Sequence, residues 1–493
     1  MGLCLSTAES APAMAVADMA APRSRCYRPE PPEEVSFPVT PMLDMAFQLL
    51  AFFIRLLPRR ELFNLPSLKD AGFYERLFTP LVTLWYLIFQ RLHFDHTLQR
   101  VLADALNGGA DSLRKDLSHQ LRSAATTSYS DARQRLPLAL LFEALTCQAR
   151  RILALNPKAT WRGFLVSLLD GTTVRLRPYG DIPKKFPPHR NQAKTQPYWC
   201  LLRAVVCFCA HTGAVLACAL GPLALSEQVL ACQIILQQSW PPCLFIGDRN
   251  FGIFQIAQTV RQAKGHALLR LTELRARKLL GHSLRVGDYS VCWTPTPSTQ
   301  LQPGCDTAPV EGRLLVVRVK RNGFRALTLY LFTTLKDKIQ YPLQELVKLY
   351  GVRWHIELNL RYLKDQMRLA QLECKSADMA QKEWVAGLMA YNLIRAAMLC
   401  AALQKALSPL ELSFSTSRRY VEIWLSEFYH KSRGSNHLWE QMLRLIQKAG
   451  RPKRKRCRPA EPRKQRHLRQ SFPPLIGSRS KARRQLQKLA QKS

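Results

Sequence analysis

Residues 350–364 are Tyr350-Gly-Val-Arg353-Trp-His-Ile-Glu357-Leu-Asn-Leu-Arg-Tyr-Leu-Lys364, so four polar side chains occur at offsets of zero, three, seven and fourteen. At roughly 100° per residue these offsets fall within an arc of about 60° on an α-helix. The spacing predicts one helix face that carries a carboxylate flanked by cations, which suits metal and phosphate chemistry. An ordinary i,i+4 surface pair of Arg353 and Glu357 would also explain part of the pattern.

Two aspartates upstream offer partners for Glu357. One apolar, strand-like run ends directly before Asp170, and a second ends at Gly247, directly before Asp248. Acidic side chains at strand ends are well placed for chemistry. Each also has a plainer explanation, because Asp-Gly is a strong turn signal and Asp248 could cap the helix that follows.

The carboxylates of Asp170, Asp248 and Glu357 form a candidate metal site. Hard oxygen ligands hold Mg²⁺ and leave coordination positions for water and phosphate. Two such ions about 4 Å apart activate an attacking oxygen and stabilise the leaving one. The set therefore points to phosphodiester cleavage or strand transfer.

Composition favours a nucleic-acid partner. The chain has 493 residues, of which 47% are hydrophobic, so it can supply sizeable cores and is not a disordered protein. Its formal net charge is +37 and its pI is near 10.2, and such a field attracts polyanions. An anionic membrane surface is the competing partner.

Neither membrane nor zinc is expected. The two most apolar stretches, 45–57 and 81–89, are too short to span a bilayer. The fourteen cysteines lack paired C-x-x-C spacing, and several of them lie in apolar runs. These features predict a cytoplasmic protein with reduced core cysteines.

The order of patterns predicts a mixed α/β architecture with helices before and after it. The helical region before the core is either a DNA-binding domain or a plain packing domain, and the basic tail is either a nonspecific DNA arm or a solvated tail. The expected segments are a flexible lead-in (1–40), a helical DNA-binding domain (41–155), the catalytic core (156–271 and 341–405), a β-rich insertion (272–340), a helical segment (406–450) and a basic, disordered tail (451–493).

The motifs resemble those of DDE transposases of the insertion sequence 4 family, which are related in plan to the transposase of transposon five. That family carries the signature Y-(2)-R-(3)-E-(6)-K, and Tyr350, Arg353, Glu357 and Lys364 fit it without a gap. Asp170-Gly-Thr and Gly-Asp248-Arg-Asn-Phe resemble its first and second aspartate motifs. The resemblance covers residues from about 41 to 405.

The resemblance implies a ribonuclease H-like catalytic core with a β-rich insertion domain, and cut-and-paste transposition through a hairpin intermediate. It implies that Asp170, Asp248 and Glu357 bind two Mg²⁺ ions, which Mn²⁺ can replace. The implied partners are double-stranded DNA, both as terminal inverted repeats and as target, and a second copy of the chain on paired ends.

The resemblance also implies a set of DNA contacts. Related enzymes hold phosphates near the cleaved end and stack a flipped base on a Trp of the insertion. Tyr350, Arg353 and Lys364 match the phosphate contacts, and Arg249 belongs to the second aspartate motif. Trp293 lies in the insertion block, but no motif aligns it, and a core or loop Trp is the commoner case.

Two other functions stay open from sequence. One is a metal-dependent nuclease of the same fold that cuts DNA without joining strands. The other is a non-enzymatic DNA-binding protein derived from a transposase. A strand-transfer assay distinguishes the nuclease from a transposase. The presence of all three acidic residues argues against the non-enzymatic protein, and loss of cleavage on their substitution would exclude it.

Overall fold

The computed structural model describes residues 49–69, 76–157, 159–188, 198–237, 242–281, 283–297, 306–319, 327–427, 435–450 and 478–490. The expected lead-in and residues 451–477 of the basic tail lie outside the described residues. The chain forms two units: Met1–Cys26, Val319–Leu327 and Lys453–Ser493 make the smaller one, and the rest makes the larger one.

Within the tail, the structure describes helix α20 (Arg479–Ala490). The expectation of disorder is therefore wrong for these residues. Their sequence contains no Gly or Pro and consists mostly of strong helix formers such as Ala, Leu, Arg, Lys and Gln.

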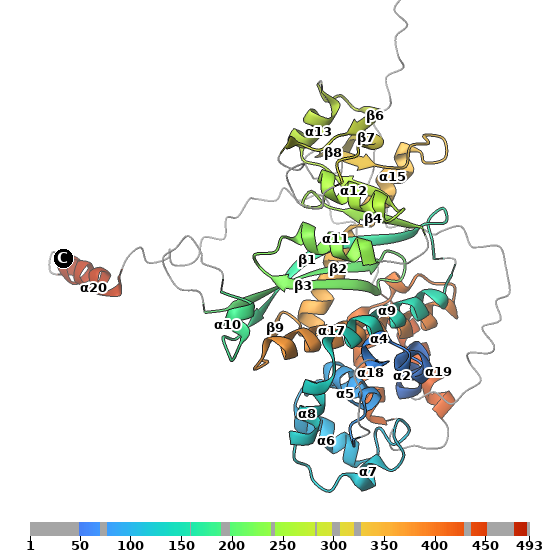
Figure 1. Ribbon diagram of the computed structural model, residues 1–493, viewed down its shortest axis with the longest axis vertical. Helices are drawn as coiled ribbons and strands as arrows, with labels where there is room; N and C mark the ends of the chain where they lie inside the picture. The colour runs from blue at the N-terminus through green and yellow to red at the C-terminus, as the bar shows by residue number, and fades with distance from the viewer. Residues whose placement is uncertain are drawn as a thin grey trace, which may run out of the picture. The chain divides into compact units, whose positions relative to one another are not determined.

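The larger unit contains one mixed sheet with the order β3-β2-β1-β4-β5-β8-β7-β6, and β9 pairs with β1 (Figure 1). Strands β1, β4 and β5 run parallel, and β2 and β3 run antiparallel to their neighbours. The strands are β1 (Leu165–Leu176), β2 (Cys200–Cys209), β3 (Val215–Pro222), β4 (Cys243–Gly247), β5 (His266–Arg270), β6 (Gly287–Trp293), β7 (Val310–Val319), β8 (Leu327–Thr333) and β9 (Gln371–Leu372).

Strand β1 continues through the Asp-Gly pair without a turn. Asp170 lies opposite Val206 and Gly171 lies opposite Val205 in the ladder with β2. The turn explanation of Asp170 is therefore wrong, because this long antiparallel pairing outweighs the local preference of Asp-Gly.

The β-rich block extends the same sheet. Strand β8 pairs antiparallel with β5, and β7 and β6 follow outward. Helix α13 (Glu273–Leu280) leads into these strands. The expected insertion is present as strands, and its strands share the hydrogen-bond ladder of the core.

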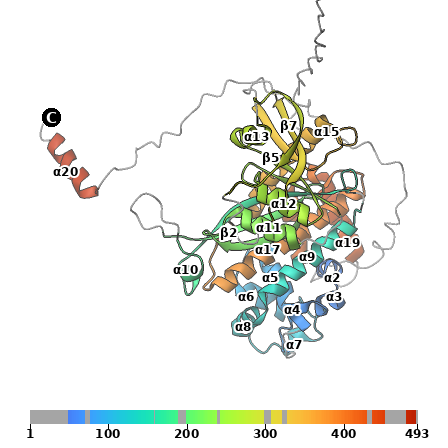
Figure 2. The same ribbon diagram turned by 45° about the horizontal axis from the view of Figure 1, so that its top comes forward.

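Helices cover both faces of the sheet. Helices α11 (Glu227–Gln237) and α12 (Phe254–Gln262) pack on one face, α11 against β2 and β3 and α12 against β5 (Figure 2). Leu169 of β1 and Cys207 of β2 belong to the core on this face. On the other face, Phe208 meets Tyr391 of α17 (Ala377–Leu403) at 6.3 Å. Side chains of a strand alternate between faces, which explains this division.

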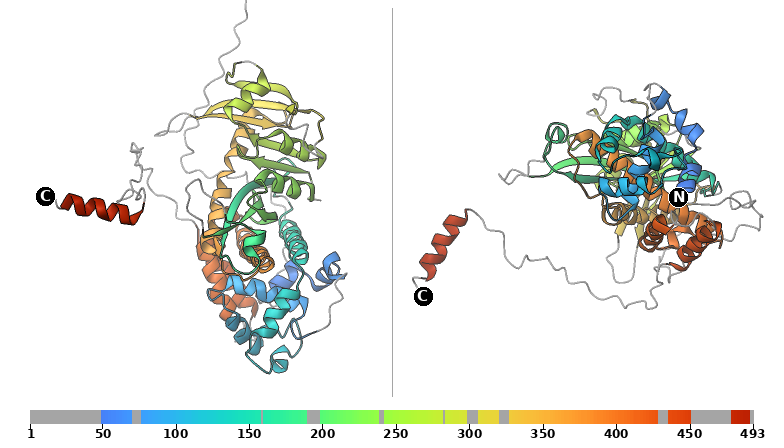
Figure 3. Two further views of the ribbon diagram at one scale, coloured as in Figure 1. Left: turned by 60° about the vertical axis from the view of Figure 1, so that its left-hand side comes forward. Right: turned by 90° about the horizontal axis from the view of Figure 1, so that it is seen from below.

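Helix α17 is the centre of the helical part. It is long and apolar enough to span a membrane by composition, but 94% of its most apolar window is buried in the protein. Helices from before the sheet and from after it pack on α17, so the two expected helical segments share one core (Figures 1 and 3).

The helices before the sheet are α2 (Leu49–Leu56), α3 (Arg59–Phe63), α4 (Pro66–Lys69), α5 (Pro80–Leu92), α6 (Leu98–Leu106), α7 (Leu117–Gln120), α8 (Thr127–Arg135) and α9 (Leu138–Ala154). Helix α10 (Ile182–Lys185) follows β1. After the sheet come α15 (Leu343–Gly351), α16 (Trp354–Arg361), the π-helical η1 (Tyr362–Gln366), α17, the 3₁₀ turn η2 (Pro409–Glu411), α18 (Phe414–Glu427) and α19 (Ser435–Lys448).

Candidate active site

Asp170 lies within β1, and Asp248 directly follows β4, the neighbouring parallel strand. The last ladder pair of β1 and β4 is Leu168 with Ile246, and Asp170 and Asp248 each follow by two residues. Continuing that register brings them opposite each other at about the 4.8 Å spacing of adjacent strands. Asp248 does not cap a helix, because α12 begins at Phe254; its Oδ1 instead accepts a hydrogen bond from the backbone N–H of Asn250 at 2.8 Å.

Asp170 is held in an environment that resists its ionisation. Burial raises the pKa of Asp170 to about 6, and the negative charges of Asp248 and Glu227 add to the rise. The backbone N–H of Gly171, which donates to Oδ1 at 2.8 Å, and the cation of Arg353 oppose it. Several carboxylates therefore act on one another here.

The Tyr350–Lys364 signature does not lie on one continuous α-helix, so that part of the prediction is wrong. Helix α15 ends just after Tyr350, and α16 begins just after Arg353. Between them the backbone makes tight three-residue hydrogen bonds, from the N–H of Arg353 to the carbonyl of Tyr350 and from Ile356 to Arg353. Lys364 lies in the wider π-helical η1. The backbone thus tightens near Arg353 and widens at Tyr362–Gln366, so the rotation per residue is not the uniform roughly 100° of an α-helix.

Arg353 joins the first aspartate to the glutamate. Its Nη1 lies 3.9 Å from Oδ2 of Asp170, and its Nη2 donates to Oε1 of Glu357 at 3.1 Å. The surface-pair explanation of Arg353 and Glu357 is therefore incomplete, because the same guanidinium also faces β1. Glu357 is thereby linked to Asp170 through a single guanidinium.

Tyr350 is buried beside the same residues. Burial raises the pKa of the Tyr350 hydroxyl, and the negative charge of Asp248 adds to the rise. The cations of Arg353 and Arg270 lower the same pKa. Arg270 is the last residue of β5, the strand next to β4, and the sequence analysis did not identify it. Its only sequence signal is a basic residue at a strand end.

The remaining DNA-contact predictions receive unequal support. Lys364 is half-buried in η1, and no contact among the described residues ties it to the carboxylates. Arg249 is exposed beside Asp248. Trp293 packs edge-on against Phe332 at 4.8 Å and Phe254 at 6.2 Å, which is the environment of a core residue.

Trp354 is an aromatic residue that the sequence analysis passed over. It follows Arg353 directly, begins α16, and is 63% exposed. Single exposed apolar side chains are ordinary on protein surfaces, and Phe94 and Leu274 are as exposed, so the place of Trp354 within the signature is what singles it out. Its position inside the signature was visible in the sequence, but its exposure was not.

The residues fit a divalent cation by their chemistry. Three carboxylates offer the oxygen ligands that Mg²⁺ prefers, and the like-charge repulsion around Asp170 is what a cation would relieve. Within the described part of the chain, no three His, Cys, Asp or Glu side chains are grouped closely enough to hold a metal as they stand. Arg353 instead provides the positive charge between Asp170 and Glu357.

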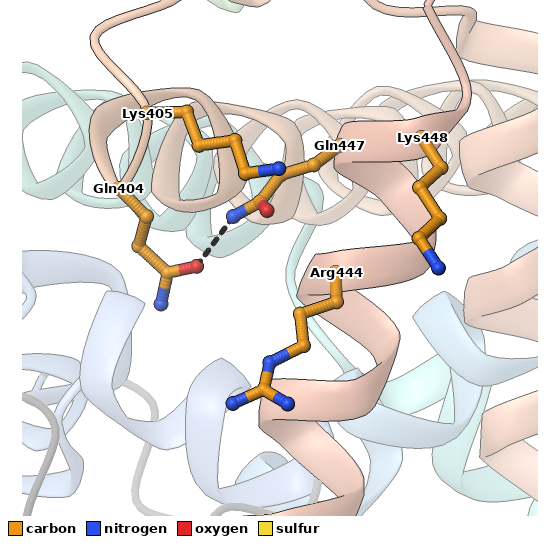
Figure 4. A pocket seen from close by; sticks show the side chains of 5 residues that line it. All are labelled: Gln404, Lys405, Arg444, Gln447 and Lys448. Atoms are coloured by element: carbon orange, nitrogen blue, oxygen red, sulfur yellow. Dashed lines mark hydrogen bonds between the residues drawn. The ribbon is translucent and has the colours of Figure 1, made fainter.

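A basic hollow lies on the helical part of the molecule, where α17 and α19 end. It has a volume of about 320 Å³, and its lining residues are Gln404, Lys405, Arg444, Gln447 and Lys448 (Figure 4). The side chain of Gln447 donates to Gln404 at 2.6 Å, and Gln404 donates to Glu440 at 3.4 Å. The C-termini of α17 and α19 each contribute about −0.5 of an elementary charge, and Glu440 contributes one negative charge. The three cations Lys405, Arg444 and Lys448 therefore leave the hollow positive.

Comparison with known proteins agrees with this geometry. Residues 161–393, which contain all three carboxylates, match the transposase DDE domain family. The chain is 27% identical over 303 residues to transposase InsG for insertion sequence element IS4 of Escherichia coli (strain K12), an alignment that covers 59% of this chain and 66% of that protein. The alignment thus spans just under two thirds of the relative.

A solved structure, the piggyBac transposase synaptic complex with hairpin DNA, matches 83% of this chain and 87% of its own at 10% identity with a TM-score of 0.39, too low to bear on the fold. Residues 161–393 are thus similar to the transposase DDE domain, and the three carboxylates lie within this segment. Within that class, the chain is similar to the IS4 transposase of Escherichia coli and carries the signature residues Tyr350, Arg353, Glu357 and Lys364.

Proposed function

We propose that this protein is a DNA transposase that cleaves the 3′ ends of an insertion sequence and joins them to target DNA. The observation that carries the proposal is the closeness of Asp170 in β1 to Asp248, which directly follows the parallel β4, with Glu357 linked to Asp170 through Arg353. A basic chain of net charge +37 supports DNA as the substrate.

We further infer that strands β3-β2-β1-β4-β5 form a ribonuclease H-like core. The support is the mixed sheet, in which the antiparallel β3 and β2 lie at one edge, next to the parallel β1, β4 and β5. The three added strands beyond β5 correspond to the β-rich insertion that the family resemblance implies.

The proposed site divides the work among its residues. Asp170, Asp248 and Glu357 would hold the metal ions, which when bound polarise the scissile phosphate and activate the attacking oxygen. Arg353 now bridges two of these carboxylates, and we expect it to turn to a DNA phosphate when they hold metal. In this proposal Tyr350, Arg270 and Lys364 contact the DNA strand that carries this phosphate.

A strand-transfer assay with a precleaved 3′-hydroxyl end and supercoiled target tests the proposal. The wild-type protein should join the end to the target with Mg²⁺ or Mn²⁺. The variants Asp170→Asn, Asp248→Asn and Glu357→Gln should lose joining and retain DNA binding. DNA that is nicked but never joined would favour the nuclease alternative, and binding without any chemistry would favour the non-enzymatic one.

The remaining features of the proposal concern partners and location. Family resemblance supports two copies of the chain on paired DNA ends, a hairpin intermediate and a cytoplasmic, DNA-associated protein. Short inverted repeats flanking the coding region, bounded by direct duplications, would identify the DNA substrate.

A further inference from the structure

A fourth carboxylate lies next to the candidate site on the α11 face of the sheet. Glu227 begins α11 and is half-buried. Its charge is one of those that act on Asp170. An acidic residue in the first turn of a helix is common because it suits the helix dipole, so its position alone assigns it no further role.

Gly171 leaves the space that Glu227 occupies. A Cβ atom at residue 171 would overlap the carboxylate of Glu227. Since β1 alternates faces, Asp170 points to the α16 side and Gly171 opens the α11 side. The glycine beside the first aspartate therefore has a steric reason that does not involve a turn.

Glu227 is connected to Asp248 by hydrogen bonds. Its Oε2 accepts from Nδ2 of Asn250 at 2.5 Å, and the backbone N–H of Asn250 donates to Asp248 at 2.8 Å. Gln228 donates to both the side-chain oxygen and the carbonyl of Asn250, at 2.6 and 3.0 Å. The start of α11 thus holds Asn250 at three points.

The turn is also fixed from its other side. Arg275 of α13 donates to the carbonyls of Arg249 and Gly252, at 2.9 and 3.1 Å. The backbone around Asp248 is therefore clamped between two helices. Within the described residues, neither Glu227 nor Asp248 forms an ion pair, although the chain has 72 Lys and Arg against 35 Asp and Glu.

We propose that Glu227 is a positioning residue for Asp248, which acts by holding Asn250 and with it the turn that carries the second metal-binding carboxylate. The proposal rests on the proposed function, since it assumes that Asp248 holds metal. Partners that orient metal ligands in this way change metal affinity or activity by about 10- to 100-fold when removed.

The test compares Glu227→Ala, Glu227→Gln, Asn250→Ala and the double variant Glu227→Ala/Asn250→Ala. Mn²⁺ binding is measured by electron paramagnetic resonance on the full chain with DNA ends, and joining is measured across a Mn²⁺ titration. Both alanine variants should weaken Mn²⁺ binding at least about tenfold. The double variant should be no worse than either single one, because the two residues act through one contact. Glu227→Gln keeps an oxygen for Asn250 and should stay near wild type.

Gly171→Ala supplies an independent arm. Its methyl group displaces the Glu227 carboxylate, so it should reproduce the Mn²⁺ defect of Glu227→Ala at unchanged DNA affinity. Glu143→Ala is the matched control, because Glu143 is also half-buried and accepts a 2.7 Å hydrogen bond from a neutral side chain, that of Ser67, away from the sheet edge. It should leave Mn²⁺ binding unchanged.

The outcomes separate the two proposals. Wild-type Mn²⁺ binding in Glu227→Ala, while Asp248→Asn has lost it, overturns the role of Glu227 and leaves the transposase proposal standing. Additive losses in the double variant also overturn it. Full activity of Asp248→Asn would instead remove the proposed function on which it rests.

Discussion

The Nη1 atom of Arg353 lies 3.9 Å from the Oδ2 atom of Asp170 and so joins the start of α16 to the middle of β1. This contact brings together two motifs that lie far apart in the sequence. It also places a cation where it lowers the pKa of a carboxyl group that burial raises.

Removing this cation should shift the pH dependence of the site. The pKa of Asp170 is about 6, so metal-dependent joining at subsaturating Mn²⁺ should fall as pH drops through about 6 and Asp170 takes up a proton. Arg353→Ala should move that midpoint to higher pH, because the lowering influence of Arg353 is lost. Arg353→Lys keeps the charge and serves as the control. Identical midpoints in all three proteins would contradict the contact.

Asp170→Asn should stabilise the protein while it abolishes joining. A folded pKa near 6 against an ordinary 3.8 means that ionised Asp170 costs up to about 3 kcal/mol of folding free energy. The sign follows from linkage: the cost is absent below pH 3.8, grows as pH rises, and is complete above about 6. Denaturant unfolding should therefore show the variant more stable at pH 8 and equal to wild type at pH 3.5. Lower stability at pH 8 would indicate that Asp170 is a structural residue.

Trp354 and Trp293 should respond differently to truncation. Trp354→Ala removes a 63% exposed ring, so unfolding should change little, while affinity for a single-stranded or distorted DNA end should fall by about 1–3 kcal/mol if a base stacks there. Trp293→Ala removes packing against Phe332 and Phe254 and should lower stability, by less than the about 3–5 kcal/mol of a fully buried aromatic because Trp293 is half-buried. Fluorescence anisotropy and urea unfolding measure the two effects. The reverse pattern would restore Trp293 as the stacking residue.

The basic hollow should contribute to the salt dependence of DNA binding. Each phosphate that a cation neutralises adds about 0.9 to the slope of log affinity against log salt. Replacing Lys405, Arg444 and Lys448 together by Gln should lower that slope by about 2–3 if the hollow of Figure 4 takes DNA phosphates. A triple Gln variant of Lys264, Lys278 and Arg285, none of which lines this hollow, should lower it less. Equal slopes in the hollow variant and wild type would exclude the contact.

The strand-borne part of the site could be predicted from sequence. Asp170 and Asp248 follow apolar runs long enough to mark strands, and the strands form as expected. Their adjacency could not be predicted, because it depends on the β1–β4 register, which both sheet faces and the whole ladder determine.

The helix-borne part was less accessible. The geometry of residues 350–364 depends on packing: Tyr362 stacks on Phe414 at 4.8 Å, and the buried Arg395 donates to Asn359 at 2.6 Å. These distant partners favour the π-helical turn over the regular helix that spacing alone suggests. Glu227 was missed for a similar reason, since only the fold places a helix start against Gly171.

Helix α17 has a practical consequence for handling this protein. Helices α5 and α9 from before the sheet cover it together with α18 and α19 from after it. A fragment that begins at β1 would uncover a 27-residue segment apolar enough to enter a lipid bilayer. Such a fragment should aggregate or adhere to membranes during expression, so the catalytic region has to be produced with its flanking helices attached.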